Sequence, residues 1–242
     1  PQQQESYAGT AADIGNVFHS TLEDFTRALI HAEKQLTREE CYAAAGNFFE
    51  KHIPSVHFGA MISTSRQRVL NQNLKTLICQ SAWAVKKQLG NFIPLGEEIS
   101  FGYGKNAPLT LSTDFGILTL KGKIDRADKL EENGNVYLRI IDYKSGNHPY
   151  REAALESGED IQLMIYMNAL LSRFGPNAVP AGAYFMQLQE ETNENASLLS
   201  GPTLDKFAKD DKKSVTGEQF SSLLQTAADT AQRLASGILS GK

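Results

Sequence analysis

The chain has 242 residues, of which 41% are apolar and 21% charged, so it is long enough for one large globular domain with a sizeable core. No apolar run approaches the roughly 18 residues that a membrane span needs, and no secretory signal stands at the start, so we expect a cytoplasmic protein. The net charge of −4 argues against binding nucleic acid through overall charge. Short basic runs remain as local patches, although most such runs are solvated faces: Arg66–Arg68, Lys86–Lys87, Lys121–Lys123 and Lys209–Lys213.

The two cysteines, Cys41 and Cys79, lie far apart and outside any CxxC pair or histidine cluster. A disulfide framework or a zinc site is therefore disfavoured, and two semi-buried thiols in a reducing cytoplasm are expected. The chain starts at Pro1 instead of Met, which suggests a fragment or a processed form.

The first third of the chain is predicted to be helical. A stripe at helical spacing, which includes Phe18 and Leu22, predicts a helix from Ala11 to about Ala32. A second helix is predicted over Arg38–His52, before Pro54. A third is predicted over about Arg66–Leu89, ending near Gly90.

Strand patterns follow, and helices return towards the end of the chain. The predicted strands are Ile99–Tyr103, Leu109–Thr113, Phe115–Lys129, Val136–Lys144 and Gly182–Gln189. The predicted helices are Asp160–Phe174 and Gly217–Leu239, and Glu190–Pro202 is expected to be a polar loop.

This order of elements predicts an α/β fold in which helices flank a mixed central sheet. No linker divides the chain, so we expect a single domain over residues 1–242. Within it, residues 34–90 would form a helical subdomain, residues 95–190 the sheet core, and residues 216–239 a C-terminal helix.

Asn133-Gly134 is a strong two-residue hairpin signal, because both residues tolerate a positive φ. If it is the turn, Glu132 faces Asn135, and counting outward places Asp125 opposite Asp142. Directly opposed side chains have Cβ atoms about 4.5–5.5 Å apart, so two carboxylates there repel each other. A divalent cation with a preference for hard oxygen ligands, Mg²⁺ or Mn²⁺, would relieve that repulsion.

Lys144 lies two residues beyond Asp142, so its ammonium would share a strand face with that carboxylate and could orient a water nucleophile or stabilise charge on a phosphate. The alternative is that Asp125 and Asp142 are surface residues near strand ends, and a bulge would shift their pairing. The apolar run Leu138–Ile141 favours the first interpretation, because an Asp and a Lys that follow a buried strand are costly unless they are paired or bind a metal.

Four short motifs resemble, in order, those of the PD-(D/E)XK nucleases, and among them the domain that ends RecB and AddB of bacterial helicase–nuclease complexes. The two core motifs are Gly122–Arg126 and Ile141–Gly146. Gly15–His19 resembles the N-terminal helix motif, and Gln162–Tyr166 resembles the QxxxY motif. The resemblance spans Gly15 to Tyr166 and implies a restriction-endonuclease-like core with a helical insertion.

The resemblance also implies roles for individual residues. His19, Asp125 and Asp142 would bind the metal with the Tyr143 carbonyl, and Lys144 would assist catalysis. Further residues would contact the DNA strand: Gln162, Tyr166 and Arg126. From the residues alone, His19 is more often a satisfied core histidine than a ligand, and Gln162 and Tyr166 could be the edge of an amphipathic helix.

The implied activity is a Mg²⁺-dependent exonuclease that hydrolyses single-stranded DNA during double-strand break repair by recombination, with an AddA-like partner subunit. Related domains hold an iron–sulfur cluster through cysteines that this sequence lacks, so no cluster is expected here. No G-x-x-x-x-G-K-[ST] loop is present, so ATP hydrolysis has no basis in this sequence. The alternatives are a catalytically silent DNA-binding scaffold of the same fold and another nuclease of this type, from a phage or a CRISPR system.

Overall fold

The computed structural model describes residues 11–32, 35–54, 65–113, 115–144, 146, 148–187, 198–208 and 214–240. The basic run at 209–213 and the side chains of residues 66, 67 and 96–98 lie outside this description. Contacts within the chain divide it into two compact units. The first unit comprises Pro1–Gly90, Tyr143–Asn147 and Gln187–Leu198, and the second comprises Asn91–Asp142, His148–Met186 and Leu199–Lys242.

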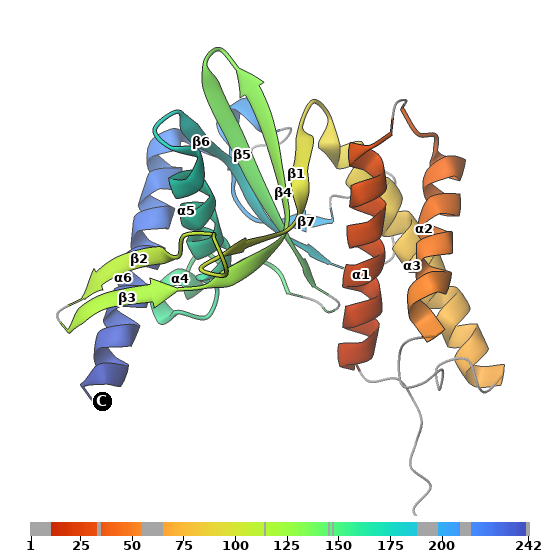
Figure 1. Ribbon diagram of the computed structural model, residues 1–242, viewed down its shortest axis with the longest axis horizontal. Coiled ribbons are helices and arrows are strands. Elements are labelled where there is room, and N and C mark those ends of the chain that lie inside the picture. Colours follow the sequence, from red (N-terminus) through yellow and green to blue (C-terminus); the bar gives the residue numbers. More distant parts are fainter. Residues whose placement is uncertain are drawn as a thin grey trace, which may run out of the picture. The chain divides into compact units, whose positions relative to one another are not determined.

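Among its described residues, the first unit contains three helices that pack side by side, α1 (Ala11–Ile30), α2 (Arg38–His52) and α3 (Ser65–Leu89) (Figure 1). All three were predicted, the first from its apolar spacing and the other two with the boundary signals at Pro54 and Gly90. Thr37 begins α2 with a reciprocal capping box, in which its side chain accepts from the Glu40 amide and its own amide donates to the Glu40 carboxylate. Asp24 joins α1 to α2, because its carboxylate accepts from His52 at 2.8 Å and from Lys51 at 2.7 Å.

The second unit is built on a mixed sheet in the order β1-β4-β5-β6-β8-β9, with β7 paired to β6. Neighbouring strands are antiparallel in the β1–β4, β4–β5, β6–β7 and β6–β8 pairs and parallel in the β8–β9 pair. The longer strands are β1 (Ile93–Phe101), β4 (Gly122–Glu132), β5 (Asn135–Lys144) and β6 (Ala178–Gln187). The short ones are β7 (Leu199–Ser200), β8 (Thr203–Leu204) and β9 (Ser214–Val215). Strand β1 carries a register shift between Pro94 and Gly96.

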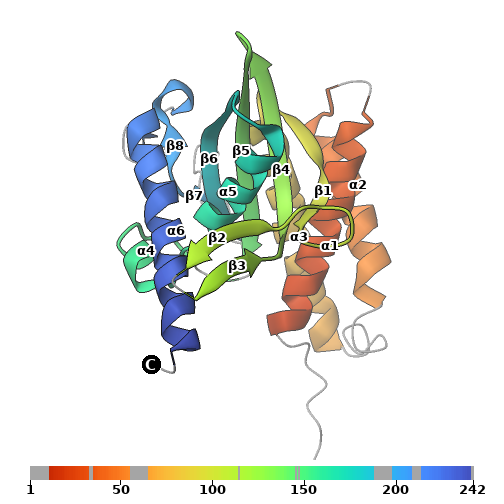
Figure 2. The same ribbon diagram turned by 60° about the vertical axis from the view of Figure 1, so that its left-hand side comes forward.

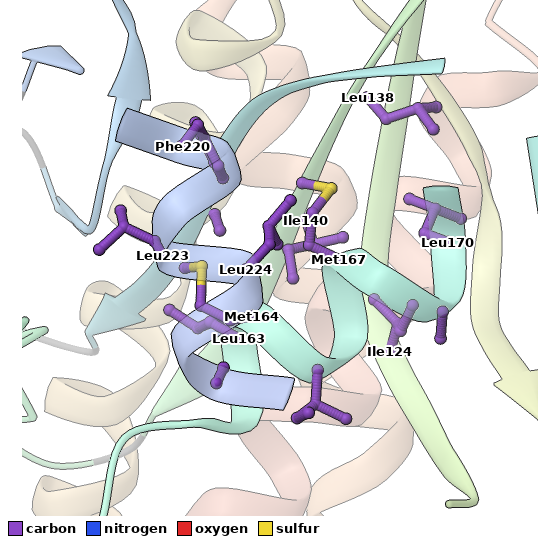
Figure 3. Close-up of a cluster of buried hydrophobic side chains, with 14 of the residues drawn as sticks. Ile124, Leu138, Ile140, Leu163, Met164, Met167, Leu170, Phe220, Leu223 and Leu224 are labelled. Atoms are coloured by element: carbon purple, nitrogen blue, oxygen red, sulfur yellow. The ribbon is translucent and has the colours of Figure 1, made fainter. Parts of the chain in front are cut away.

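Helices α5 (Gln162–Phe174) and α6 (Gly217–Leu239) lie against this sheet (Figure 2). Their apolar faces meet the strands in a continuous core, to which Met164 and Met167 of α5, Leu224 of α6 and Ile140 of β5 all belong (Figure 3). Helix α6 begins with a second capping box, between Thr216 and Gln219. The predicted α/β class with a mixed sheet and packed helices is confirmed.

The predicted strand Phe115–Lys129 was wrong in one respect, because the structure breaks it at Lys121. Its first half, β3 (Gly116–Leu120), pairs with β2 (Leu109–Thr113) in a separate two-stranded sheet. Its second half is β4, which pairs with β1 and β5. The chain changes partners at this point, and a change of partner leaves no mark in the alternation of apolar residues.

Other strand boundaries in the structure differ from the predicted ones by a few residues, and the shortest elements were not predicted. Strand β1 begins at Ile93 instead of Ile99, and β6 begins at Ala178 instead of Gly182. The predicted loop Glu190–Pro202 contains strand β7, and its residues 190–197 lie outside the described chain. Helix α4 (Ala154–Ser157) and the 3-10 turn η2 (Asp205–Phe207) are too short to show periodicity.

The β4–β5 hairpin has the predicted turn and the predicted register. Asn133 and Gly134 have φ angles of 51° and 79°, as a tight hairpin turn requires. The ladder runs without a shift from Glu132↔Asn135 to Arg126↔Ile141. A one-residue slip would move every side chain to the opposite face, so this register decides which residues the strand ends present.

A buried group of three charges holds the hairpin in the middle. Asp128 and Arg139 are register partners, and the Arg139 Nε donates to Asp128 Oδ2 at 2.7 Å. Arg126 grips the same carboxylate with two hydrogen bonds of 2.8 Å. Arg126 and Asp128 are 1% and 0% exposed, and the Arg139 guanidinium lies 4.2 Å from the centroid of the Phe92 ring. We call Arg126, Asp128 and Arg139 the hairpin ion cluster.

The hairpin ion cluster predicts a large stability loss in Asp128→Asn. Removing the carboxylate charge leaves the buried Arg126 and the partly buried Arg139 without their anion, and breaking a buried pair typically costs about 3–5 kcal/mol. Urea unfolding followed by far-UV circular dichroism should show this loss in the free energy of unfolding. The control Glu131→Gln removes an exposed carboxylate that pairs with Lys129 and should change stability little. Equal losses in the two variants would contradict this role.

The same cluster predicts a loss of stability in acid. Burial alone would raise the pKa of Asp128, but the charges of Arg126 and Arg139 outweigh it and hold that pKa below its usual value. A carboxylate with a lowered pKa contributes stability above the unfolded-state pKa of about 3.9 and loses that contribution as pH falls through its folded-state pKa. The difference in unfolding free energy between wild type and Asp128→Asn should therefore be full above about pH 5 and shrink steadily below pH 4. A difference that stays constant across this range would contradict the assignment.

Candidate active site

Asp125 and Asp142 are the first residues beyond the last pair of the β4–β5 ladder, Arg126↔Ile141. Both belong to the second unit. Asp142 is 4% exposed, whereas Asp125 is half-buried. The structure confirms the register that leads up to them, and their direct opposition, one step further, stays a prediction.

The burial of Asp142 bears on what it can bind. An ionised carboxylate inside a protein is costly unless a cation or hydrogen-bond donors compensate for its lost hydration. The hard oxygen atoms of two carboxylates suit Mg²⁺ or Mn²⁺. Across the described ranges, no three His, Cys, Asp or Glu side chains gather closely enough to hold an ion by themselves. The side chain of Glu98, another acid near this region of sequence, lies outside the described residues.

His19 meets Tyr143 within the first unit. Their ring centroids lie 5.8 Å apart at 85°, and Phe18 packs on the same tyrosine at 5.7 Å. Tyr143 is 2% exposed. The N-terminal helix motif and the DYK motif, more than 120 residues apart, are therefore in contact. Lys144 follows Tyr143 as the half-buried last residue of β5.

Gln162 and Tyr166 lie one turn apart on α5, where the Gln162 Nε2 donates to the Tyr166 Oη at 3.0 Å. The Tyr166 ring packs edge-on against Phe101 at 5.7 Å. Gly122 allows this approach, because a Cβ there would lie 2.6 Å from the Phe101 ring and 2.9 Å from the Tyr166 ring. Gly122 of the first core motif is thus in close contact with Tyr166 of the QxxxY motif, and a larger residue at this position would clash.

Arg126 has a different environment from the one that a DNA contact requires. It is 1% exposed, and it donates two hydrogen bonds to the Asp128 carboxylate. The structure supports a structural role for Arg126, in the hairpin ion cluster. Sequence reasoning missed this cluster, although Asp128 and Arg139 already fell opposite each other in the predicted register.

Cys41 and Cys79 are free and buried. Burial raises the pKa of both thiols above the usual value, which disfavours the thiolate form that reacts and binds metals. None of the helices in the described ranges combines the length and the apolar character that crossing a bilayer demands.

Comparison with known proteins places these features in a family. The family model described as the PD-(D/E)XK nuclease superfamily matches residues 2–241. The B-type subunit of the ATP-dependent helicase/deoxyribonuclease from Alkaliphilus oremlandii is 31% identical over 210 residues, which cover 81% of this chain and 18% of that protein. The protein of the same name from Alkaliphilus metalliredigens is 32% identical over 203 residues, covering 78% of this chain and 18% of the relative.

A third relative of that name, from Caldanaerobacter subterraneus, is 30% identical over 200 residues, covering 78% of this chain and 17% of the relative. The chain therefore spans less than a fifth of the length of these curated relatives. The match to the family model extends over nearly the whole chain and includes all four motifs. The chain belongs to the PD-(D/E)XK nuclease superfamily.

Proposed function

We propose that this chain is a Mg²⁺-dependent exonuclease domain that hydrolyses phosphodiester bonds of single-stranded DNA. The observation that carries the proposal is the end of the β4–β5 hairpin. There, Asp125 and the buried Asp142 follow directly after the ladder, and Lys144 stands two residues further along β5. Charged residues at the end of a buried strand are costly unless they have a chemical partner. Membership of a nuclease superfamily supports a phosphodiester as the substrate, with a divalent cation as the partner of the two carboxylates and a phosphate oxygen as the partner of Lys144.

Four residues would hold the metal: His19, Asp125, Asp142 and, through its main-chain carbonyl, Tyr143. The described side chains of His19, Asp125 and Asp142 do not form one cluster, so the ion would have to draw them together. Two carboxylates and a carbonyl supply the oxygen ligands that Mg²⁺ prefers, and Mn²⁺ could replace it. A bound ion of this kind lowers the pKa of a coordinated water and polarises the phosphoryl oxygens. The contact of His19 with Tyr143 supports its inclusion, because it holds the imidazole beside the end of β5.

The Lys144 ammonium would donate hydrogen bonds to the attacking water and to a phosphoryl oxygen. The water oxygen forms a bond to phosphorus, the bond from phosphorus to the leaving sugar oxygen breaks, and the water proton finally resides on the leaving group or in solvent. Gln162 and Tyr166 would position the DNA strand or support the side chain of Lys144. Their mutual hydrogen bond and the packing of Tyr166 on Phe101 keep both side chains in one arrangement.

The biological setting is proposed from the relatives. Their name describes one subunit of an ATP-dependent assembly with helicase and deoxyribonuclease activities. We place this chain as the nuclease domain of such a subunit, with an AddA-like helicase partner, in cytoplasmic repair of double-strand breaks by homologous recombination. No iron–sulfur cluster is proposed for this chain, since such clusters are held by four cysteines and the sequence contains two, Cys41 and Cys79.

The central test is hydrolysis of a labelled single-stranded oligonucleotide with Mg²⁺ or Mn²⁺. Asp142→Ala and Lys144→Ala should each lower the turnover rate by about 10²–10³-fold or more, because each removes a charge that stabilises the transition state. Asp229→Ala, which alters an exposed aspartate on α6, is the matched control and should retain wild-type activity. Equal activity in wild type and both site variants would overturn the enzyme assignment and favour a silent DNA-binding scaffold.

The role of His19 is tested by metal affinity. His19→Ala should raise the Mn²⁺ dissociation constant, measured by titration calorimetry without DNA, by at least about tenfold, the effect that losing even a supporting residue commonly has. His31→Ala, which alters an exposed histidine beyond the end of α1, is the control. An unchanged dissociation constant in His19→Ala would leave this histidine with a packing role only.

A further inference from the structure

The loop between β1 and β2 presents an exposed aromatic ring beside lysines. Tyr103 is 55% exposed. The Lys121 ammonium lies 5.9 Å from the centroid of its ring, within cation–π range. Lys105 and Lys123 are also exposed. Most exposed aromatic residues are isolated, whereas this one lies in a basic surrounding.

The loop is held in place by its own hydrogen bonds. The Gly102 amide donates to the carbonyls of Asn106 and Ala107, and the Asn106 amide donates back to the Tyr103 carbonyl. The Asn106 side chain donates to the Ser100 hydroxyl at 2.9 Å. The Tyr103 ring is therefore carried on a closed turn, and little ordering entropy is lost when it binds a ligand.

Ser100, to which the loop is hydrogen-bonded, also connects the loop to the strand that carries Asp125. Ser100 of β1 pairs with Lys123 of β4, so the two share one face of the sheet. Lys123 is two residues before Asp125 on β4, and alternate residues of a strand share a face at a spacing of about 6.6 Å. Tyr103, Lys121 and Lys123 thus form a row that leads to Asp125. We call Tyr103, Lys121 and Lys123 the basic–aromatic row.

The basic–aromatic row is positively charged, whereas the chain as a whole is negative. The chain as a whole carries a net charge of −4. Between Ser100 and Ile124, however, the sequence contains Lys105, Lys121 and Lys123 against one acid, Asp114. A positive strip with an exposed ring suits single-stranded nucleic acid, whose phosphates pair with lysines and whose bases stack on aromatic side chains.

We infer that the basic–aromatic row is a binding subsite for single-stranded DNA, in which a base stacks on Tyr103 and neighbouring phosphates pair with Lys121 and Lys123. This inference rests on the proposed function and extends it, since the row would deliver the strand to Asp125. It also assigns a role to the Lys121–Lys123 run, which the sequence singles out and the proposed chemistry does not use. Stacking accepts any base, so the subsite would bind without sequence preference.

The test measures binding of a fluorescent oligo(dT) to the chain in the Asp142→Ala background, without divalent metal, so that cleavage cannot interfere. Tyr103→Ala should weaken binding about tenfold, and Tyr103→Phe, which retains the ring, should bind within about twofold of the parent. Lys121→Ala with Lys123→Ala should lower the slope of log affinity against log salt by about 1.4, because each lost phosphate contact removes about 0.7. Tyr103→Ala should leave that slope unchanged.

Two matched variants control for exposure and charge. Phe115→Ala removes another exposed ring, and Lys129→Ala removes a positive charge from the far end of β4; both should bind like the parent. An abasic oligonucleotide should make Tyr103→Ala and its parent equal, since the stacking partner is missing. Weakening by Tyr103→Ala that persists with the abasic strand, or no weakening by either row variant, would overturn the inference.

Activity distinguishes failure of this inference from failure of the proposed function. In the wild-type background with Mg²⁺, Tyr103→Ala should raise KM about tenfold and leave kcat nearly unchanged, because the ring contacts the strand away from the reacting phosphate. An active wild type whose KM does not respond to Tyr103→Ala overturns the subsite alone. A wild type that binds oligo(dT) through the row but never hydrolyses it overturns the nuclease proposal alone.

Discussion

The register of the β4–β5 hairpin is the constraint on which the rest of this molecule depends. It is set at one end by Asn133 and Gly134, whose positive φ angles make a two-residue turn. It is secured in the middle by Asp128 and Arg139, which face each other across the ladder. Because strand side chains alternate between faces, these two devices determine where Asp125 and Asp142 emerge.

Asp128 and Asp142 of the β4–β5 hairpin lie in two different environments. Asp128 is enclosed by two guanidinium groups, so its charge is neutralised inside the protein. Asp142 is almost as deeply buried, but it stands where the ladder has ended. An external cation can approach a carboxylate at a strand end more readily than one that two arginines already enclose. The contrast between two aspartates of one hairpin supports a structural role for Asp128 and is consistent with the metal-binding role proposed for Asp142.

Much of the fold was predictable, because it follows from local chemistry. Three signals act over only a few residues: the apolar stripe with Phe18 and Leu22, the helix-ending Pro54, and the Asn133-Gly134 turn. The helices and the hairpin lie where these signals predict them. The break at Lys121 was not predictable, since it depends on which strands become neighbours. The environment of Arg126 was also missed, because its charge is neutralised by Asp128 two residues along β4, which in turn pairs with Arg139 across the ladder.

Strand β1 has features that protect the edge of a sheet from pairing with another chain. It begins the strand order of the sheet, and an edge strand with free amides and carbonyls invites pairing with another chain. Pro94 lacks an amide hydrogen, and the register shift beside it bends the strand, so this stretch is a poor template for strand addition. Two copies of this sheet would thus be hindered from joining edge to edge along the first half of β1.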